Sequence, residues 1–256
     1  TAVSEQFILD ATPPAVEVAF KEKPFIRDAG KVMGEGSLLL SAKDDNGIAS
    51  WNIEAYDQMG QRVKQVSGTG NPPGEFVWNS EEEEDFVLRE GRYEIRVTVQ
   101  DRAKNETDRR FVLESKPIAE LRQGKLKLLV RDVIFAAYKD TLDSAGAEML
   151  RINRESLAEV VRILNRFPEY SILLEGHALN IYVSDRTKFQ QEERILLPLT
   201  ERRAAAVLKA LTDAGIDKNR ISAKAFGGRQ PNASVTDKSV WWQIRRVEFY
   251  LVGPKE

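Results

Sequence analysis

The sequence has 256 residues, with 38 lysines and arginines, 40 aspartates and glutamates and a net charge of −2. This length is enough for two domains with cores of their own, and the balanced charge argues against a nucleic-acid binder, which normally carries a basic excess. The sequence has no apolar run of the roughly 18 residues that a membrane-spanning helix needs, and the absence of cysteine excludes disulfides and cysteine-ligated metal sites.

The first 14 residues are interpreted as the tail of a preceding β-domain or as a linker. The run FILD at residues 7–10, followed by a proline, echoes the run FVLE at residues 111–114, which is also followed by a proline. Because the second copy closes a β-rich region, the first copy is a candidate end of an earlier domain of the same kind. The alternative is that short strands simply resemble one another.

Residues 15–115 carry the pattern of an all-β domain. Between Tyr93 and Val99 every second residue is apolar, as a half-buried strand requires. Clusters of Asn, Asp, Gly and Pro separate the short apolar runs. The expected strands cover residues 15–20, 37–42, 49–56, 76–78, 93–99 and 109–113. Short strands at this spacing predict a β-sandwich.

Aromatic and turn residues recur across this domain: DDNGI at residues 44–48, Trp51, Trp78, EGRY at residues 90–93 and DRAKN at residues 101–105. On these features the region resembles bacterial immunoglobulin-like domains of the type found in flagellar-hook capping proteins and envelope repeats. The resemblance implies a structural module in which aromatic residues pack the core. Its Asx-rich turn fits no EF-hand loop, so we expect no calcium site.

Residues 116–125 are predicted to be a linker, with Pro117 and Gly124 as breakers. In residues 126–256, strand-like runs alternate with runs of helical period. The expected strands are 126–135, 170–176, 220–226 and 245–252, and the expected helices begin at Asn153 and at Leu199 with Thr200 as an N-cap. This βαβαββ order predicts a two-layer α/β sandwich with both helices on one face of the sheet.

Several short motifs follow one another in this second domain: GH at residues 176–177, LT at residues 199–200, RA at residues 203–204 with Val207, and RRVE at residues 245–248. On these motifs the domain resembles the OmpA-like C-terminal domain, the module that tethers bacterial outer-membrane proteins to peptidoglycan. The resemblance implies a non-enzymatic, outer-membrane-associated structural protein of the cell envelope, located in the periplasm and without a cofactor.

The departures from the family pattern fall on the ligand site. In the family, an Asp holds the ammonium and an Arg the carboxylate of the diamino acid in the peptidoglycan stem peptide. The Asp position is Leu179 here, and two Asn positions fall on Leu196 and Ile244, so that Arg203 alone remains of the polar group. The sequence therefore predicts an OmpA-like domain that has lost normal peptidoglycan binding.

Three roles are open for residues 180–198, which are predicted to form a long loop rich in apolar residues. The loop covers the old pocket, contacts an envelope protein partner, or supplies Asp185 as a substitute acid that restores stem-peptide binding together with Arg203. Structurally, Arg203 is alternatively expected to pair with Asp185 or Glu192. Thr200 and His177 complete the candidate ligand-side residues that match the family.

His177 is the only histidine, which excludes a multi-histidine metal site and makes a histidine-centred relay hard to support. We expect it to make a structural hydrogen bond at the end of its strand. The sequence contains no nucleophile elbow, zinc-protease motif or phosphate-binding glycine loop. It therefore gives no reason to expect an enzyme, a metal or a cofactor.

Overall fold

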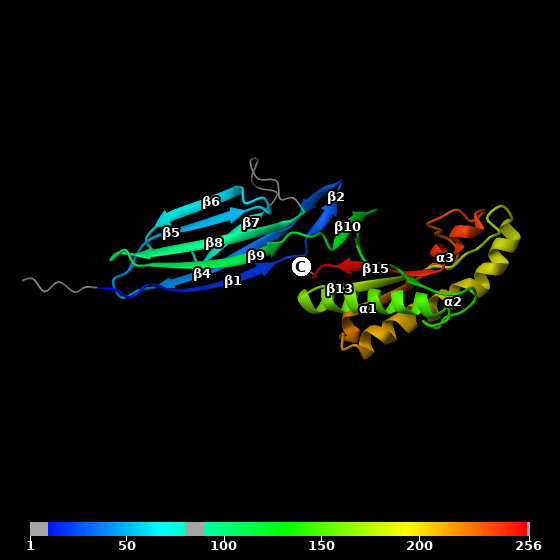
Figure 1. Ribbon diagram of the computed structural model, residues 1–256. Helices are drawn as coiled ribbons and strands as arrows, with labels where there is room; N and C mark the ends of the chain where they lie inside the picture. The colour runs from blue at the N-terminus through cyan, green and yellow to red at the C-terminus, as the bar shows by residue number, and fades with distance from the viewer. Residues whose placement is uncertain (1–9, 80–89, 255–256) are drawn as a thin grey trace, which may run out of the picture. The chain divides into compact units, whose positions relative to one another are not determined.

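The computed structural model describes residues 10–79 and 90–254. The chain divides into two compact units, Thr1–Pro117 and Ile118–Glu256 (Figure 1). Residues 1–9, which carry most of the predicted N-terminal tail, lie outside the described part. Within the described part, no helix is both long and apolar enough to cross a bilayer.

Two antiparallel sheets make up the first unit, one in the order β1-β4-β7 and the other in the order β6-β5-β8-β9. A short hairpin, β2 and β3, joins β1 to β4. The strands are β1 (Ala15–Glu22), β2 (Ile26–Asp28), β3 (Lys31–Met33), β4 (Glu35–Lys43), β5 (Ile48–Tyr56), β6 (Arg62–Thr69), β7 (Glu75–Asn79), β8 (Arg92–Asp101) and β9 (Glu106–Glu114). All six predicted strands are present. The sequence missed the short strands β2 and β3. It also missed β6, because this edge strand is mostly exposed and lacks apolar alternation.

The two sheets of the first unit share one hydrophobic core. The alternation predicted along β8 is confirmed, since Tyr93, Val97 and Val99 are all buried. Trp51 of β5 meets Phe76 of β7 edge to face at 5.0 Å between ring centroids, so a side-chain contact joins the sheets directly. These observations confirm an all-β first domain.

The second unit alternates strands and helices as predicted. Its elements are β10 (Ala119–Arg122), β11 (Lys125–Leu128), β12 (Val133–Ile134), α1 (Ala147–Arg166), β13 (Ser171–Gly176), α2 (Arg186–Asp213), β14 (Ile221–Ala225), α3 (Trp241–Ile244) and β15 (Arg246–Val252). The strands lie in the order β14-β13-β15-β11-β10, and β12 pairs with β15. α2 packs against β13 and β14, while α1 packs against β12 and α2. The α/β class of this unit is therefore as expected.

Two boundaries in the second unit differ from the prediction. Residues 119–125 were expected in a linker, but β10 and β11 form a hairpin that turns at Gln123 and Gly124, both with positive φ. α1 begins at Ala147, so Asn153 is no N-cap. Asn153 is instead fully buried, and its amide bonds both the N–H and the carbonyl of Ile134. The sequence alone does not distinguish an asparagine that caps a helix from a buried asparagine that hydrogen-bonds the backbone of a strand.

The largest correction concerns the predicted loop at residues 180–198. Most of it is helical, because α2 begins at Arg186 and continues through Pro198. Proline lacks the N–H for the helical hydrogen bond and bends a helix rather than always ending it. The helix changes direction along its length in Figure 1. Thr200 consequently lies inside α2 and is not its N-cap.

Candidate functional site

The candidate site forms where the end of β13 meets the middle of α2. A Cβ atom on Gly176 would lie 2.5 Å from the carbonyl oxygen of Thr200, so only glycine allows this close approach. The Thr200 hydroxyl donates to the carbonyl of Leu197 at 2.9 Å and accepts from the N–H of Gly227 at 3.2 Å. Thr200 therefore ties helix, strand end and the loop after β14 together.

Arg203 lies fully buried beneath this crossing. Its Nε donates to the carbonyl of Lys139 at 2.8 Å, one Nη to Ala136 at 2.8 Å and the other Nη to His177 at 3.3 Å. The guanidinium also lies over the ring of Phe135, 5.2 Å from its centroid. Burial lowers the pKa of Arg203 to about 10, so the side chain stays charged at neutral pH. Arg203 is thus bonded to backbone carbonyls and not to Asp185 or Glu192.

A small pocket of about 140 Å³ adjoins Arg203. Leu179 and Leu196, two of the three positions where the family pattern is polar, both line it. Ile244 does not, because it is fully buried in the core one residue before Arg245. The lining residues are Ala137, Tyr138, Ala178, Leu179, Ile181, Glu192, Leu196, Leu199, Arg203, Trp241 and Arg245.

The polar groups of the pocket differ in whether they have a hydrogen-bond or ion-pair partner. The Tyr138 hydroxyl donates to Oε1 of Glu192 at 2.8 Å, and Tyr138 itself has a left-handed φ of 53°. Nε of Arg245 donates to the carbonyl of Phe135 at 3.2 Å. Arg245 is half-buried and pairs with no acid of the described residues, and burial lowers its pKa. The pocket therefore combines two guanidinium groups, one acid and apolar walls.

Sequence reasoning missed the roles of Glu192 and Arg245. Glu192, Leu196, Leu199 and Arg203 are spaced by four, three and four residues, which places them on one face of a helix. This signal was present, but it has meaning only if residues 186–198 are helical. Arg245 was noticed only as part of the RRVE motif.

Asp185 lies far from this pocket. It is the N-cap of α2, where Oδ1 accepts from the N–H of Lys188 at 3.0 Å. Asp185 precedes Arg203 by 18 residues, which corresponds to about 27 Å along a helix. Asp185 is not among the residues that line the pocket beside Arg203, so the structure does not bring these two side chains together there.

His177 follows the last residue of β13 and is buried. At the strand end its backbone N–H donates to the carbonyl of Arg246 at 2.8 Å. Neither ring nitrogen has a hydrogen-bond partner, and Nε2 lies 3.6 Å from Oε2 of Glu248. The imidazole stacks on Phe226 at 5.2 Å with an interplanar angle of 3°. Burial lowers its pKa to about 3, assisted by the nearby Arg246, so His177 is neutral.

Glu175 and Glu248 flank this histidine, and the three side chains place potential ligand atoms within 4.8 Å of one another. Their charges are already neutralised, since Glu175 binds Lys125 at 2.6 Å and Glu248 binds Lys127 at 2.8 Å. A further hydrogen bond comes to Glu248 from Arg246 and another from Tyr250. A divalent ion would add positive charge among these cations, so the cluster does not fit a metal site.

The pKa of Glu248 reflects the same cluster. Burial alone would raise it, but Arg246, Lys127 and the Tyr250 hydroxyl outweigh burial and lower it to about 2. Conversely, burial and the hydrogen bond to Glu248 raise the pKa of Tyr250. The cluster is a buried, internally balanced ion-pair network with a stabilising role.

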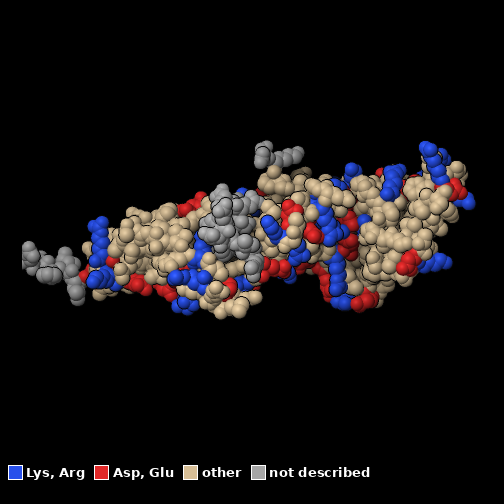
Figure 2. All heavy atoms as spheres, turned by 90° about the horizontal axis from the view of Figure 1, so that it is seen from above, with Lys and Arg blue, Asp and Glu red and all other residues tan. Residues whose placement is uncertain are grey.

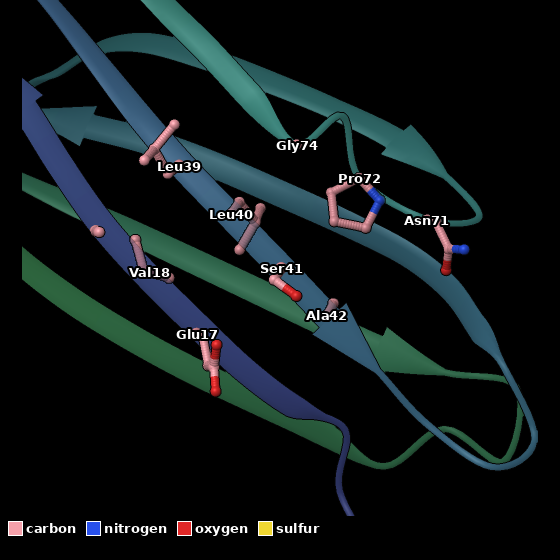
Figure 3. A pocket seen from close by; sticks show the side chains of 10 residues that line it. Glu17, Val18, Leu39, Leu40, Ser41, Ala42, Asn71, Pro72 and Gly74 are labelled. Atoms are coloured by element: carbon pink, nitrogen blue, oxygen red, sulfur yellow. The ribbon is translucent and has the colours of Figure 1, made fainter.

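The first unit offers less chemistry. Figure 3 shows an open hollow of about 600 Å³ between β1, β4 and the loop that carries Asn71 and Pro72. Glu17 is the one charged side chain among its lining residues. On the face of the molecule shown in Figure 2, positive and negative side chains are interspersed. The pocket beside Arg203 is taken as the candidate site because it brings Arg203 together with Leu179 and Leu196.

Comparison with known proteins finds similarity within the second unit. Residues 135–240 match the OmpA family. A stretch of 124 residues is 32% identical to the peptidoglycan-associated lipoprotein of Brucella melitensis and covers 48% of this chain and 65% of that protein. A stretch of 98 residues is 33% identical to the peptidoglycan-associated lipoprotein of Mesorhizobium japonicum, covering 38% of this chain and 53% of that one.

The chain thus spans between half and two thirds of the length of these relatives. Among solved structures, the chain is similar to the peptidoglycan-associated lipoprotein from Burkholderia pseudomallei, with a TM-score of 0.38 and 23% identity, over 47% of this chain and 89% of that one. The second unit of this chain is therefore similar to the OmpA family over residues 135–240.

Proposed function

We propose that this chain is a non-enzymatic structural and interaction protein of the bacterial cell envelope, located in the periplasm, whose OmpA-like domain has lost normal peptidoglycan binding. Its first unit serves as an immunoglobulin-like spacer or interaction module. One observation carries the proposal: Leu179 occupies the position of the family's ammonium-binding Asp, in a pocket whose Arg203 is already bonded to three backbone carbonyls.

The expected loss of affinity is large. Removing one partner of a buried charge pair costs about 2–5 kcal/mol. At about 1.4 kcal/mol per factor of ten, binding of the diamino acid is weakened roughly thirtyfold to several-thousandfold. Leu179 has no acceptor for an ammonium group, and three of the five N–H groups of Arg203 already donate to backbone carbonyls.

A pull-down with purified peptidoglycan sacculi tests this proposal. We expect weak or undetectable binding of the wild-type chain. Leu179→Asp restores binding only in part, because Leu196 remains apolar and Arg203 stays bonded to backbone. Val183→Asp is the matched control, since Val183 is exposed, lies nearby in sequence and is not a lining residue. Tight, saturable binding of the wild-type chain contradicts the proposal.

A second candidate function is stem-peptide binding with a substitute acid. The observation in its favour is Glu192, which lines the pocket from α2, whereas Asp185 caps the distant end of the helix. In the same pull-down, this candidate requires that the wild-type chain binds, that Glu192→Gln abolishes binding and that Asp185→Asn leaves binding unchanged.

The interaction role has its own support. Ile181, Val183 and Ile195 are 47%, 51% and 57% exposed. These exposed apolar side chains fall within 15 residues of sequence, and a patch of exposed apolar side chains favours a contact with another protein. We therefore place the proposed envelope protein partner on residues 180–198, with chemical cross-linking in the periplasm as the test.

A further inference from the structure

Arg245 is a charged group without a counter-ion at the edge of an apolar pocket. Only its Nε is engaged, by the carbonyl of Phe135 at 3.2 Å, so both Nη groups keep their hydrogen-bonding capacity. Among the described residues, no acid lies within ion-pair distance of Arg245. A half-buried guanidinium without an ion-pair partner favours the binding of an anion. Its planar arrangement of N–H donors matches the two oxygens of a carboxylate.

The neighbouring Arg203 adds positive charge to the same pocket without taking a ligand itself. Its three carbonyl partners hold the guanidinium fully buried. The Tyr138 hydroxyl, by contrast, already donates to the one acid in the pocket, Glu192. The electrostatic balance of the pocket is therefore positive, with two guanidinium groups against one hydrogen-bonded carboxylate.

The remaining walls define the body of the ligand. They are apolar and come from Leu179, Ile181, Leu196, Leu199 and Trp241. The volume of about 140 Å³ is close to that of an apolar cavity of about 150 Å³ that is known to hold benzene. A group with the size of one aromatic ring or one branched aliphatic side chain fits this space.

We propose that this pocket binds a small carboxylate with an apolar body, held by Arg245, and does not recognise a diamino acid. The inference rests on the proposed loss of diamino-acid binding. It names the class of ligand that the pocket binds instead. Replacement of polar residues by Leu179 and Leu196 then changes the specificity of the pocket, and Arg245 takes over carboxylate binding from Arg203.

Three ligands of similar shape separate the contributions of charge and apolar contact. Phenylacetate, phenylacetamide and phenethylamine carry a negative, a neutral and a positive head group on the same ring. Each is titrated into the full chain by calorimetry, with meso-diaminopimelate as the family-type ligand. We expect phenylacetate to bind roughly tenfold or more tightly than phenylacetamide, since a hydrogen bond to a charged group contributes about 1.5–3 kcal/mol. Phenethylamine and diaminopimelate should not bind.

Two variants test the assignment to Arg245. Arg245→Gln should remove the preference for phenylacetate over phenylacetamide, whereas Arg194→Gln, an exposed arginine of α2 outside the pocket, should leave it unchanged. Leu179→Asp provides a second route if Arg245→Gln fails to fold. It places an acid in the pocket and should weaken phenylacetate and favour phenethylamine.

The outcomes separate this inference from the proposed function. Equal affinity for phenylacetate and phenylacetamide, or no saturable binding of phenylacetate, overturns the inference even when sacculi do not bind. Binding of diaminopimelate in preference to phenylacetate overturns both. Tight sacculus binding that Arg245→Gln leaves unchanged overturns the proposed function alone, provided that phenylacetate still binds.

Discussion

Arg203 shows how one residue supports two different interpretations. In the sequence it is the remaining member of a ligand-binding group, and in the structure it is a buried cation that holds residues 136–139 and the end of β13 together. A buried charge is costly unless hydrogen bonds replace its hydration. Here three carbonyl oxygens and the ring of Phe135 provide that replacement. Substitution of Arg203 therefore affects folding, and it is a poor probe of binding.

His177 gives the second unit a specific dependence on pH. Its pKa is about 3 in the folded chain, against 6.5 for an unperturbed histidine. Between these values the unfolded chain binds more protons, so the free energy of unfolding decreases as the pH falls below about 6.5. The slope approaches about 1.4 kcal/mol per pH unit, the value for one proton. Glu248, with a pKa of about 2, contributes a further loss only below about 4.5.

Urea unfolding at pH 7 and pH 5 measures this effect without interference from Glu248. We expect wild-type stability to fall between the two pH values. His177→Phe should abolish most of this change, because phenylalanine keeps an aromatic ring against Phe226 but cannot be protonated. An equal loss of stability in the wild type and the variant would show that His177 is not the group responsible.

Helix α2 decides the geometry of the candidate site. Its second half is predicted by the spacing of apolar residues. Its first half is not predicted, because Pro198 indicates a helix break. The helix begins at Arg186, after the N-cap Asp185, whose side chain accepts from the N–H of Lys188. This extension brings Glu192 and Leu196 onto the face that carries Arg203. A loop of the same sequence would not hold these side chains in a fixed register.

Asp185→Ala tests whether this residue acts as a cap or as a ligand group. Loss of an N-cap costs about 1 kcal/mol, so the thermal midpoint of the second unit should decrease, with binding of phenylacetate unchanged. Asp213→Ala, at the other end of α2, is the control, because its exposed pair with Lys209 contributes little. A change in phenylacetate affinity with Asp185→Ala would show that Asp185 contributes to ligand binding.

At the scale of the whole molecule, the division into two units predicts two independently folding domains. Fragments 10–117 and 118–256 should each unfold cooperatively, since each is a compact unit with buried apolar residues of its own. Fragment 126–256 should be less stable than fragment 118–256, because it lacks β10 and exposes the backbone edge of β11. Failure of either unit to fold alone would contradict the division at Pro117.

The sequence by itself determined the class of each unit. Alternation such as that of Tyr93 to Val99 follows from the two-residue period of a strand, and short ordered motifs such as GH and RRVE indicated the OmpA-like domain. These signals are local, so they can be recognised in the sequence without knowledge of the tertiary contacts. The replacement of polar residues by Leu179 and Leu196 was visible for the same reason.

Only the tertiary structure decided what the site contains. Asn153 and Arg203 are polar residues whose partners are backbone groups of distant segments, and no spacing in the sequence identifies such partners. The exclusion of Asp185 and the inclusion of Glu192 and Arg245 depend on a helix that continues through Pro198 and on α3, which places Arg245 beside Phe135. Long-range packing overrides the local helix-breaking signal of proline, because burial of the apolar face of α2 favours the continuous helix.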